Sequence, residues 1–125
     1  MTSYNVFGGD QTRPNIHIDD IANAYRHFLA NPDLPSGCYN AGFENISIID
    51  IANLVKDKVG AEVVVSESND PRSYRQDSSK LLSTGFSASK TVSCAIDEII
   101  NAFNQGVLPD GENSYTVETM QRLGI

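Results

Sequence analysis

Apolar residues recur at the spacing of a helix in three separate segments of this chain. A face that repeats every three or four residues is typical of a helix with one buried side. The residues that form these three faces are Ile21, Ala24, Tyr25, Phe28 and Leu29; Ile48, Ile51, Ala52, Val55 and Val59; and Val92, Ala95, Ile96, Ile99, Ile100 and Phe103. Short segments typical of strands lie between them, and such an alternation predicts an α/β fold.

The ends of the predicted elements follow from capping residues and turn signals. Strands are expected at residues 4–7, 15–18, 38–41 and 62–66. The first long helix is expected to begin at a cap on Asp19 or Asp20 and to stop at Asn31–Pro32. The second is expected to begin after Ser47 and to end at Gly60. The remaining predictions are a short helix that is capped by Asp77 and contains Leu81 and Leu82, a loop over 109–111 and a short helix near 117–123.

The composition limits the class of protein. A chain of 125 residues is long enough for one domain with a real core, so residues 1–125 are interpreted as a single domain. Nine Lys and Arg stand against sixteen Asp and Glu, a net charge of -7 that argues against a general nucleic-acid binder. No apolar run could span a membrane, and no signal peptide is visible. Cys38 and Cys94 are expected to be small buried thiols in the reducing cytoplasm.

Several residue types that often carry chemistry have simpler explanations in this chain. Gly8–Gly9 is the only close glycine pair, and it lacks the spacing of a dinucleotide-binding turn. His17 lies between two isoleucines and is interpreted as a satisfied core residue, while His27 is expected to be solvated. Asp19 and Asp20 are interpreted as helix caps rather than as paired carboxylates for acid–base catalysis. No spacing of histidine, cysteine and carboxylate residues indicates a metal site.

The loop that follows the strand expected at 62–66 is the most unusual segment. Within residues 69–77 lie Arg72, Tyr74, Arg75 and two carboxylates. Guanidinium groups suit phosphate because their planar fork donates two parallel hydrogen bonds. Two interpretations are equally open from the residue types: a site for a phosphate-bearing ligand, or a cluster of surface salt bridges.

Five short motifs, in this order along the chain, resemble those of a known family. They are Arg13–Ala22 (RPNIHIDDIA), Gly37–Gly42 (GCYNAG), Ser47–Ile48 at a helix start, Asp70–Lys80 (DPRSYRQDSSK) and Gly85–Phe86. Together they resemble the C-terminal part of NAD-dependent nucleotide-sugar epimerases and dehydratases, which are extended short-chain dehydrogenases similar to UDP-galactose 4-epimerase. The resemblance spans residues 5–104 and leaves 105–125 as a tail.

The resemblance implies a nucleotide-sugar site on four residues of this chain. In the family, the counterpart of Arg13 contacts the substrate diphosphate, and the counterpart of Asp70, four residues before Tyr74, helps to bind the nucleotide. A second phosphate-binding arginine usually lies three residues before that aspartate, where this chain has Glu67. Arg72, in the same loop, is the candidate to replace it. The predicted substrate-binding residues are therefore Arg13, Asp70, Arg72 and Tyr74, with no catalytic, cofactor-binding or metal-binding residue.

The same resemblance implies that a cofactor-binding half is missing. Family members carry a glycine-rich cofactor turn and a catalytic Tyr-x-x-x-Lys pair N-terminal to these motifs, and this chain has neither. The chain is therefore expected to be a C-terminal fragment that binds no cofactor and is inactive alone, whereas the whole enzyme would use NAD or NADP. The alternatives are a free-standing nucleotide-sugar-binding or regulatory module and a structural interaction domain.

A missing half would also leave apolar surface without cover. In the family, the strands corresponding to 15–18 and 38–41 join the cofactor-binding sheet, and exposed strand edges tend to pair with other strands. The expected partners are therefore a nucleotide sugar and a second copy of the chain, in a homodimer or larger assembly with one of these strands near a two-fold axis. Neither nucleic acid nor a membrane is expected as a partner.

Overall fold

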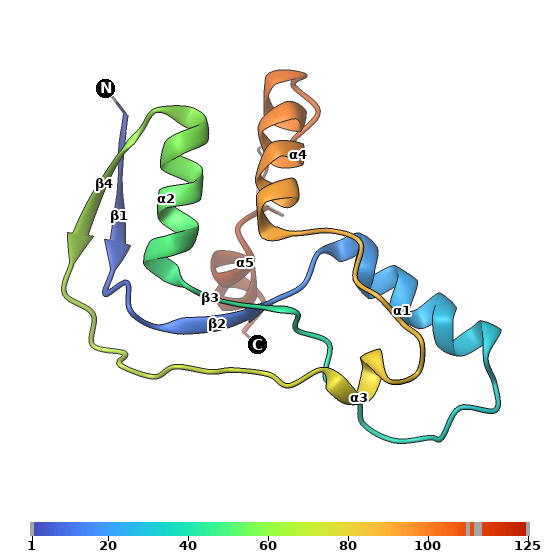
Figure 1. Ribbon diagram of the computed structural model, residues 1–125. Coiled ribbons are helices and arrows are strands. Elements are labelled where there is room, and N and C mark those ends of the chain that lie inside the picture. Colours follow the sequence, from blue (N-terminus) through green and yellow to red (C-terminus); the bar gives the residue numbers. More distant parts are fainter. Residues whose placement is uncertain (1, 110, 112–113, 125) are drawn as a thin grey trace.

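The computed structural model of the chain describes residues 2–109, 111 and 114–124. This part contains two separate two-stranded sheets and five helices (Figure 1). The strands of the second sheet lie between those of the first along the chain. The strands are β1 (Ser3–Phe7), β2 (Thr12–Asn15), β3 (Glu44–Ser47) and β4 (Glu62–Ser66). The helices are α1 (Ile18–Ala30), α2 (Ile48–Val59), α3 (Ser79–Leu82), α4 (Val92–Asn104) and α5 (Thr116–Leu123). The predicted α/β class is confirmed, and none of these described helices is both long and apolar enough to cross a membrane.

β1 and β4 form a parallel pair, and α2 packs against both strands (Figure 1). Parallel strands need a long crossover connection, and the segment between β1 and β4 supplies one that contains α2. Val6 of β1, Ala52 of α2 and Ala61 just before β4 are all buried, and the Tyr4 hydroxyl donates a hydrogen bond to the Ala52 carbonyl. The strands predicted at residues 4–7 and 62–66 are therefore confirmed, and they anchor a small core.

β2 and β3 pair in antiparallel fashion, with Arg13 opposite Ile46. This pairing corrects the strand expected at residues 15–18. The strand lies earlier and ends at Asn15, because His17 already serves as the N-cap of α1. The strand before α1 therefore has the expected length of four residues but lies three positions earlier in the chain.

Residues 38–41 form no strand, which corrects a second expectation. Their polar groups find local partners instead: Lys80 Nζ donates to the Cys38 carbonyl (2.8 Å), and the Tyr39 hydroxyl donates to the Pro35 carbonyl (2.6 Å). β3 follows a few residues later, at Glu44–Ser47. The strand edges expected to carry a dimer are therefore not present as predicted: residues 38–41 form no strand, and of residues 15–18 only Asn15 lies in one.

α1 begins directly after His17, whose Nδ1 accepts a hydrogen bond from the backbone N–H of Asp19 (3.1 Å). The expectation that Asp19 or Asp20 caps this helix is therefore wrong. Asp20 instead accepts hydrogen bonds from the backbone N–H groups of Ser89 and Lys90 and from the Ser89 hydroxyl, at 2.8–3.1 Å. Asp20 is only 1% exposed, and it ties α1 to the segment that leads into α4.

Only part of the predicted apolar side of α1 is covered, because Ala24 and Phe28 are half-buried while other residues of that side are open to solvent. The inner side of the helix is held by polar contacts, through Asp20 and through His27, whose Nε2 lies 2.8 Å from Thr84 Oγ1. Tyr25 and Leu29 are exposed. The expectation that His27 is solvated is also wrong, because this ring lies against Thr84 and packs edge-on against Phe86.

The predicted ends of α2 are confirmed. Ser47 Oγ accepts from the backbone N–H of Asp50 (3.1 Å) at the start of α2, and Gly60 ends that helix with a φ of 69°. This prediction succeeds because a cap involves only neighbouring residues. The expected cap of α3 is displaced by one residue: Ser78 is its N-cap, and Asp77 Oδ1 accepts from the backbone N–H of Ser79 (2.9 Å) from the position before it.

The cysteines differ from the expectation of buried thiols. Cys38 is exposed because its segment joins no sheet, and Cys94 is half-buried in the first turn of α4. Thr91 forms hydrogen bonds with Cys94 that lower the pKa of the Cys94 thiol.

Asp110, in the loop predicted over 109–111, lies outside the described residues.

Candidate functional site

Residues of the loop between β4 and α3 run alongside β2 (Figure 1). The backbone N–H of Tyr74 donates to the Thr12 carbonyl (2.9 Å), and the backbone N–H of Thr12 donates to Ser73 Oγ (3.1 Å). Arg13 follows Thr12 in β2, so the loop side chains lie next to it. The two sequence segments that carry the predicted site are therefore joined by backbone contacts.

Two arginine side chains meet at the carboxylate of Asp70. Arg72 Nε donates to Asp70 Oδ1 (2.6 Å), and Arg72 Nη2 donates to Asp70 Oδ2 (2.9 Å). Arg13 Nη2 lies 3.7 Å from the same Oδ2, and Arg13 Nη1 donates to the Arg72 carbonyl (2.6 Å). One carboxylate is therefore shared by two guanidinium groups.

Tyr74 lies against Arg13. The Arg13 Cζ is 5.0 Å from the centre of the Tyr74 ring, which is cation–π distance. The structure thus brings together all four residues predicted to bind a substrate: Arg13, Asp70, Arg72 and Tyr74. We call these four the arginine cluster.

The electrostatics of the arginine cluster depend on Asp70. Hydrogen bonds from the Arg72 side chain and backbone lower the pKa of Asp70 from 3.8 to about 2, and the charges of Arg72 and Arg13 add to this shift. Asp70 in turn raises the pKa of Arg72. The Arg72 side chain is 69% exposed, so solvent screens the pair. Two guanidinium groups and one carboxylate leave one positive charge on a chain whose net charge is -7.

Side-chain amides attach the loop to the rest of the fold, which the sequence did not reveal. Buried Gln11 donates through Nε2 to the Asp70 carbonyl (2.9 Å) and accepts through Oε1 from the backbone N–H of Gly9 (2.6 Å). Asn45 of β3 makes a two-way contact with the backbone of Gln76, at 2.9 and 3.1 Å. A short polar side chain between two loops carries no periodic signal, so only the structure identifies these residues as positioning groups.

A cleft of about 500 Å³ lies next to the arginine cluster, between the turn after β1 and the loop after β4. Asp10, Glu67 and Asp70 all line it, whereas neither Arg13 nor Arg72 does. Three carboxylates in one cleft disfavour a phosphate group there. Glu67, which occupies the position of the usual second arginine, is therefore part of an acidic surface, and an anion would have to approach the guanidinium groups from another side.

A second charged cluster surrounds His17. Its Nε2 lies 2.9 Å from Glu98 Oε2 and its Nδ1 accepts from Asp19, so the interpretation of His17 as a satisfied buried residue is confirmed. His17, Asp19 and Glu98 also place one possible metal ligand each within 4.8 Å of one another, a grouping that sequence spacing did not indicate. Lys90 Nζ lies 2.6 Å from Glu98 Oε1 and 3.9 Å from Asp19 Oδ2. An ammonium group therefore already neutralises part of this cluster.

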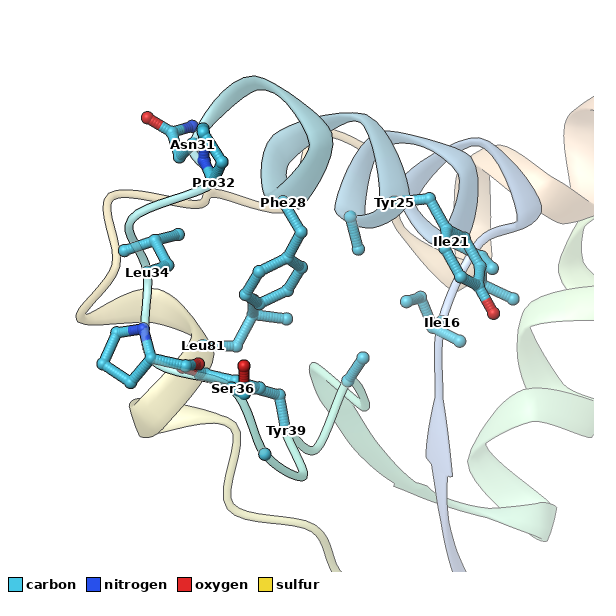
Figure 2. A pocket seen from close by; sticks show the side chains of 14 residues that line it. Ile16, Ile21, Tyr25, Phe28, Asn31, Pro32, Leu34, Ser36, Tyr39 and Leu81 are labelled. Atoms are coloured by element: carbon cyan, nitrogen blue, oxygen red, sulfur yellow. The ribbon is translucent and has the colours of Figure 1, made fainter.

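A second cavity, of about 710 Å³, lies between α1 and residues 31–41 (Figure 2). Its walls are mainly apolar, and in Figure 2 the Phe28 ring projects from α1 toward Tyr39, at a distance of 4.8 Å between ring centres. None of the residues of the arginine cluster lines it. The apolar cavity and the arginine cluster are therefore separate features.

The arrangement of the two strand pairs and the helices around them is found in part of a larger solved structure. Among solved structures, the chain is similar to RMD from Pseudomonas aeruginosa, determined in complex with NADPH. The TM-score is 0.70 at 20% sequence identity, over 86% of this chain and 37% of that chain. The chain thus spans little more than a third of that protein, and at this identity the likeness concerns the fold. No protein-family model matches the sequence, and no curated protein matches it significantly.

Proposed function

We propose that this chain is the C-terminal, substrate-binding part of an NAD- or NADP-dependent enzyme that acts on nucleotide sugars in the cytoplasm, as an epimerase, dehydratase or related enzyme. Its role is to hold the diphosphate of the nucleotide sugar through the arginine cluster. The cofactor and the catalytic tyrosine belong to a part of the enzyme that this chain does not contain.

One observation carries this proposal. Arg13 and Arg72, 59 positions apart in the sequence, lie at the same carboxylate, and Tyr74 lies against Arg13. Two adjacent guanidinium groups can donate to the oxygens of both phosphates of a diphosphate, and charge-assisted hydrogen bonds are the strong ones. The fold supports the proposal, because the similar RMD structure is that of an NADPH-bound protein.

Asp70 has a definite task in this proposal. It holds both guanidinium groups in place before a ligand arrives, which lowers the cost of ordering two long side chains on binding. Arg72 is largely exposed, so a diphosphate can reach its outer side while Asp70 keeps the inner one. The acidic cleft lined by Glu67 keeps the anion away from the other side of the loop.

Calorimetric titration of the chain with UDP, dTDP and inorganic pyrophosphate tests the proposal. Arg13→Ala is expected to raise the dissociation constant of the nucleotides by about tenfold or more, because a charge-assisted contact contributes roughly 1.5–3 kcal/mol. Arg75→Ala is the matched control, since Arg75 is an exposed arginine of the same loop outside the cluster. No heat with any of the three ligands, or equal losses in both variants, would contradict the proposal.

A second candidate function, a structural interaction domain, is favoured by one feature of the same cluster. Asp70 satisfies Arg72 and approaches Arg13 without any ligand, as expected of a salt-bridge cluster that only fastens a loop. In that case Arg72→Ala would lower the melting temperature while the chain binds none of the nucleotides. A free-standing nucleotide-sugar-binding or regulatory module would bind them without any cofactor-binding partner.

A further inference from the structure

The cleft of about 500 Å³ beside the arginine cluster lies at the carboxyl ends of the parallel strands β1 and β4 (Figure 1). Gly8 follows β1 and Glu67 follows β4, and the backbone N–H of Gly8 donates to the Ser66 carbonyl (2.8 Å), so the two strand ends are held together. In α/β folds, ligands bind in the crevice outside the carboxyl ends of the strands. The cleft therefore occupies the place where such a fold binds a ligand, and its volume is that of a small-molecule site.

The carboxylates of the cleft differ in what they are free to bind. Asp70 accepts from Arg72 on both of its oxygens, so it is already occupied. Asp10 and Glu67 are exposed, and neither forms a hydrogen bond or ion pair with any other residue that the structure describes. A ligand in the cleft therefore meets two unpartnered carboxylates, which accept hydrogen bonds and donate none.

The proposed function, on which this inference rests, determines which part of the ligand enters the cleft. A nucleotide sugar carries its diphosphate in the middle, between the nucleoside and the sugar. In the proposed function the diphosphate lies at the arginine cluster, and the sugar extends to a catalytic tyrosine in a part of the enzyme that this chain does not contain. The nucleoside is left for the cleft, which adjoins the cluster because Asp70 belongs to both.

Free carboxylates distinguish between the nucleobases. The two oxygens of a carboxylate suit a pair of neighbouring N–H groups, which they accept side by side. Guanine has such a pair, because its ring N1–H lies next to its exocyclic amino group. Uracil and thymine have one ring N–H between two carbonyl groups, and adenine and cytosine have an amino group next to an unprotonated ring nitrogen. Each of these four bases would therefore place a lone pair against one carboxylate oxygen.

We propose that the cleft holds the base of a guanosine diphosphate sugar, and that the Glu67 carboxylate accepts hydrogen bonds from guanine N1–H and from the guanine amino group. Glu67 takes this role because it lies in the same loop as Asp70 and has a longer side chain than Asp10. Val65 and Pro71, which also line the cleft, offer apolar surface to the faces of the base. Asp10 keeps the potential of the cleft negative, which favours the donor groups of a ligand.

The same inference gives a reason for the residue at position 67. The family resemblance places a second phosphate-binding arginine there, where this chain has Glu67. Arg72 of the same loop supplies a second guanidinium group beside the carboxylate that Arg13 approaches. Phosphate binding then depends on Arg13 and Arg72, and position 67 is free to recognise a base.

Calorimetric titration with GDP and IDP tests the proposal, because the inosine base lacks only the exocyclic amino group of guanine. GDP is expected to bind at least about tenfold more tightly than IDP, since IDP cannot form one of the hydrogen bonds to a charged acceptor. Glu67→Gln is expected to remove most of this difference, because an amide presents one acceptor beside a donor. Glu62→Gln is the matched control: Glu62 is exposed at the other end of β4 and does not line the cleft, so the difference should persist.

Inorganic pyrophosphate distinguishes a failure of this inference from a failure of the proposed function. It carries no base, so it should bind the Glu67→Gln variant at least as tightly as the wild type, whereas Arg13→Ala should weaken it. If pyrophosphate binds but GDP and IDP bind equally, or if Glu67→Gln leaves their difference intact, the assignment of guanine is wrong and the diphosphate site stands. If none of the three ligands binds to the folded chain, as checked by circular dichroism, both proposals are wrong.

Discussion

Asp70 accepts two hydrogen bonds from the guanidinium group of Arg72, one on each carboxylate oxygen, at 2.6 and 2.9 Å. Only Pro71 lies between the two residues in the sequence, so these hydrogen bonds form within a single turn of the loop. The backbone N–H of Arg72 adds a third contact to the same carboxylate (3.1 Å). These bonds hold the Arg72 guanidinium group at the carboxylate that Arg13 also approaches (3.7 Å), so both arginines of the cluster depend on Asp70.

The protonation of Asp70 is expected to be shifted measurably by these hydrogen bonds. The pKa of its carboxyl is lowered from 3.8 to about 2, with hydrogen bonds from Arg72 as the main cause. The ion pair is therefore intact above pH 3.8 and is lost as the pH falls through about 2. Carbon-13 NMR of the side-chain carboxyl gives this midpoint directly, and Arg72→Ala should return it toward 3.8. An unchanged midpoint in that variant would show that another group causes the shift.

Gly8 is expected to be required for the position of Gln11. Gly8 has a φ of 81°, and a Cβ there would overlap the amide of Gln11, which binds the Asp70 carbonyl. Gly8→Ala should therefore lower the free energy of unfolding and weaken nucleotide binding. Gly60→Ala is the control, because Gly60 also has a positive φ (69°) but has no atom within 4 Å of such a Cβ. It should cost about 1 kcal/mol of stability and leave binding unchanged. Urea unfolding and calorimetry would show whether the two variants differ.

Asp20 is expected to contribute more to stability than any surface aspartate. Burial alone would raise its pKa, but hydrogen bonds from Ser89 and Lys90 outweigh burial and lower it. Asp20→Asn removes one of two acceptor oxygens and should cost about 1–3 kcal/mol at neutral pH by urea unfolding. Asp33→Asn, at an exposed position, should change stability by no more than about 0.5 kcal/mol.

The stability difference between the wild type and Asp20→Asn should depend on pH, which supplies a second check on Asp20. A carboxyl with a lowered pKa in the folded state stabilises the fold fully above its ordinary pKa of 3.8, and this contribution is lost as the pH falls through the lowered value. The gap in stability between the wild type and Asp20→Asn should therefore narrow at acid pH. A gap that stays constant down to pH 2 would mean that the charge of Asp20 is not what matters.

The isolated chain is expected to bind neither NAD nor NADPH and to convert no nucleotide sugar. It has no glycine-rich turn through which the backbone could approach a pyrophosphate, and no Tyr-x-x-x-Lys pair. Calorimetry with both cofactors checks the first half of this prediction, and a coupled absorbance assay checks the second. Micromolar binding of either cofactor would mean that the chain carries a cofactor site of another kind.

Elements that depend on neighbouring residues were predictable from the sequence. β1 and β4 follow from their residue types, and α2 follows from its apolar stripe between Ser47 and Gly60. The polar loop after β4 was also identifiable, because two arginines in an acidic chain are conspicuous. These features are local, and local preferences act whatever the rest of the chain does.

The relations between distant segments were decided by the tertiary structure alone. Periodicity identified the apolar side of α1 but not its partner, and in the structure Phe28 of that side packs against Tyr39 while Tyr25 and Leu29 stay exposed. The sequence offered a salt-bridge cluster and a phosphate site as equal interpretations of the loop, and only the position of Arg13 beside Asp70 showed that two distant arginines meet there. Periodicity records which residues share a face, whereas the partner of that face depends on contacts between segments far apart in the chain.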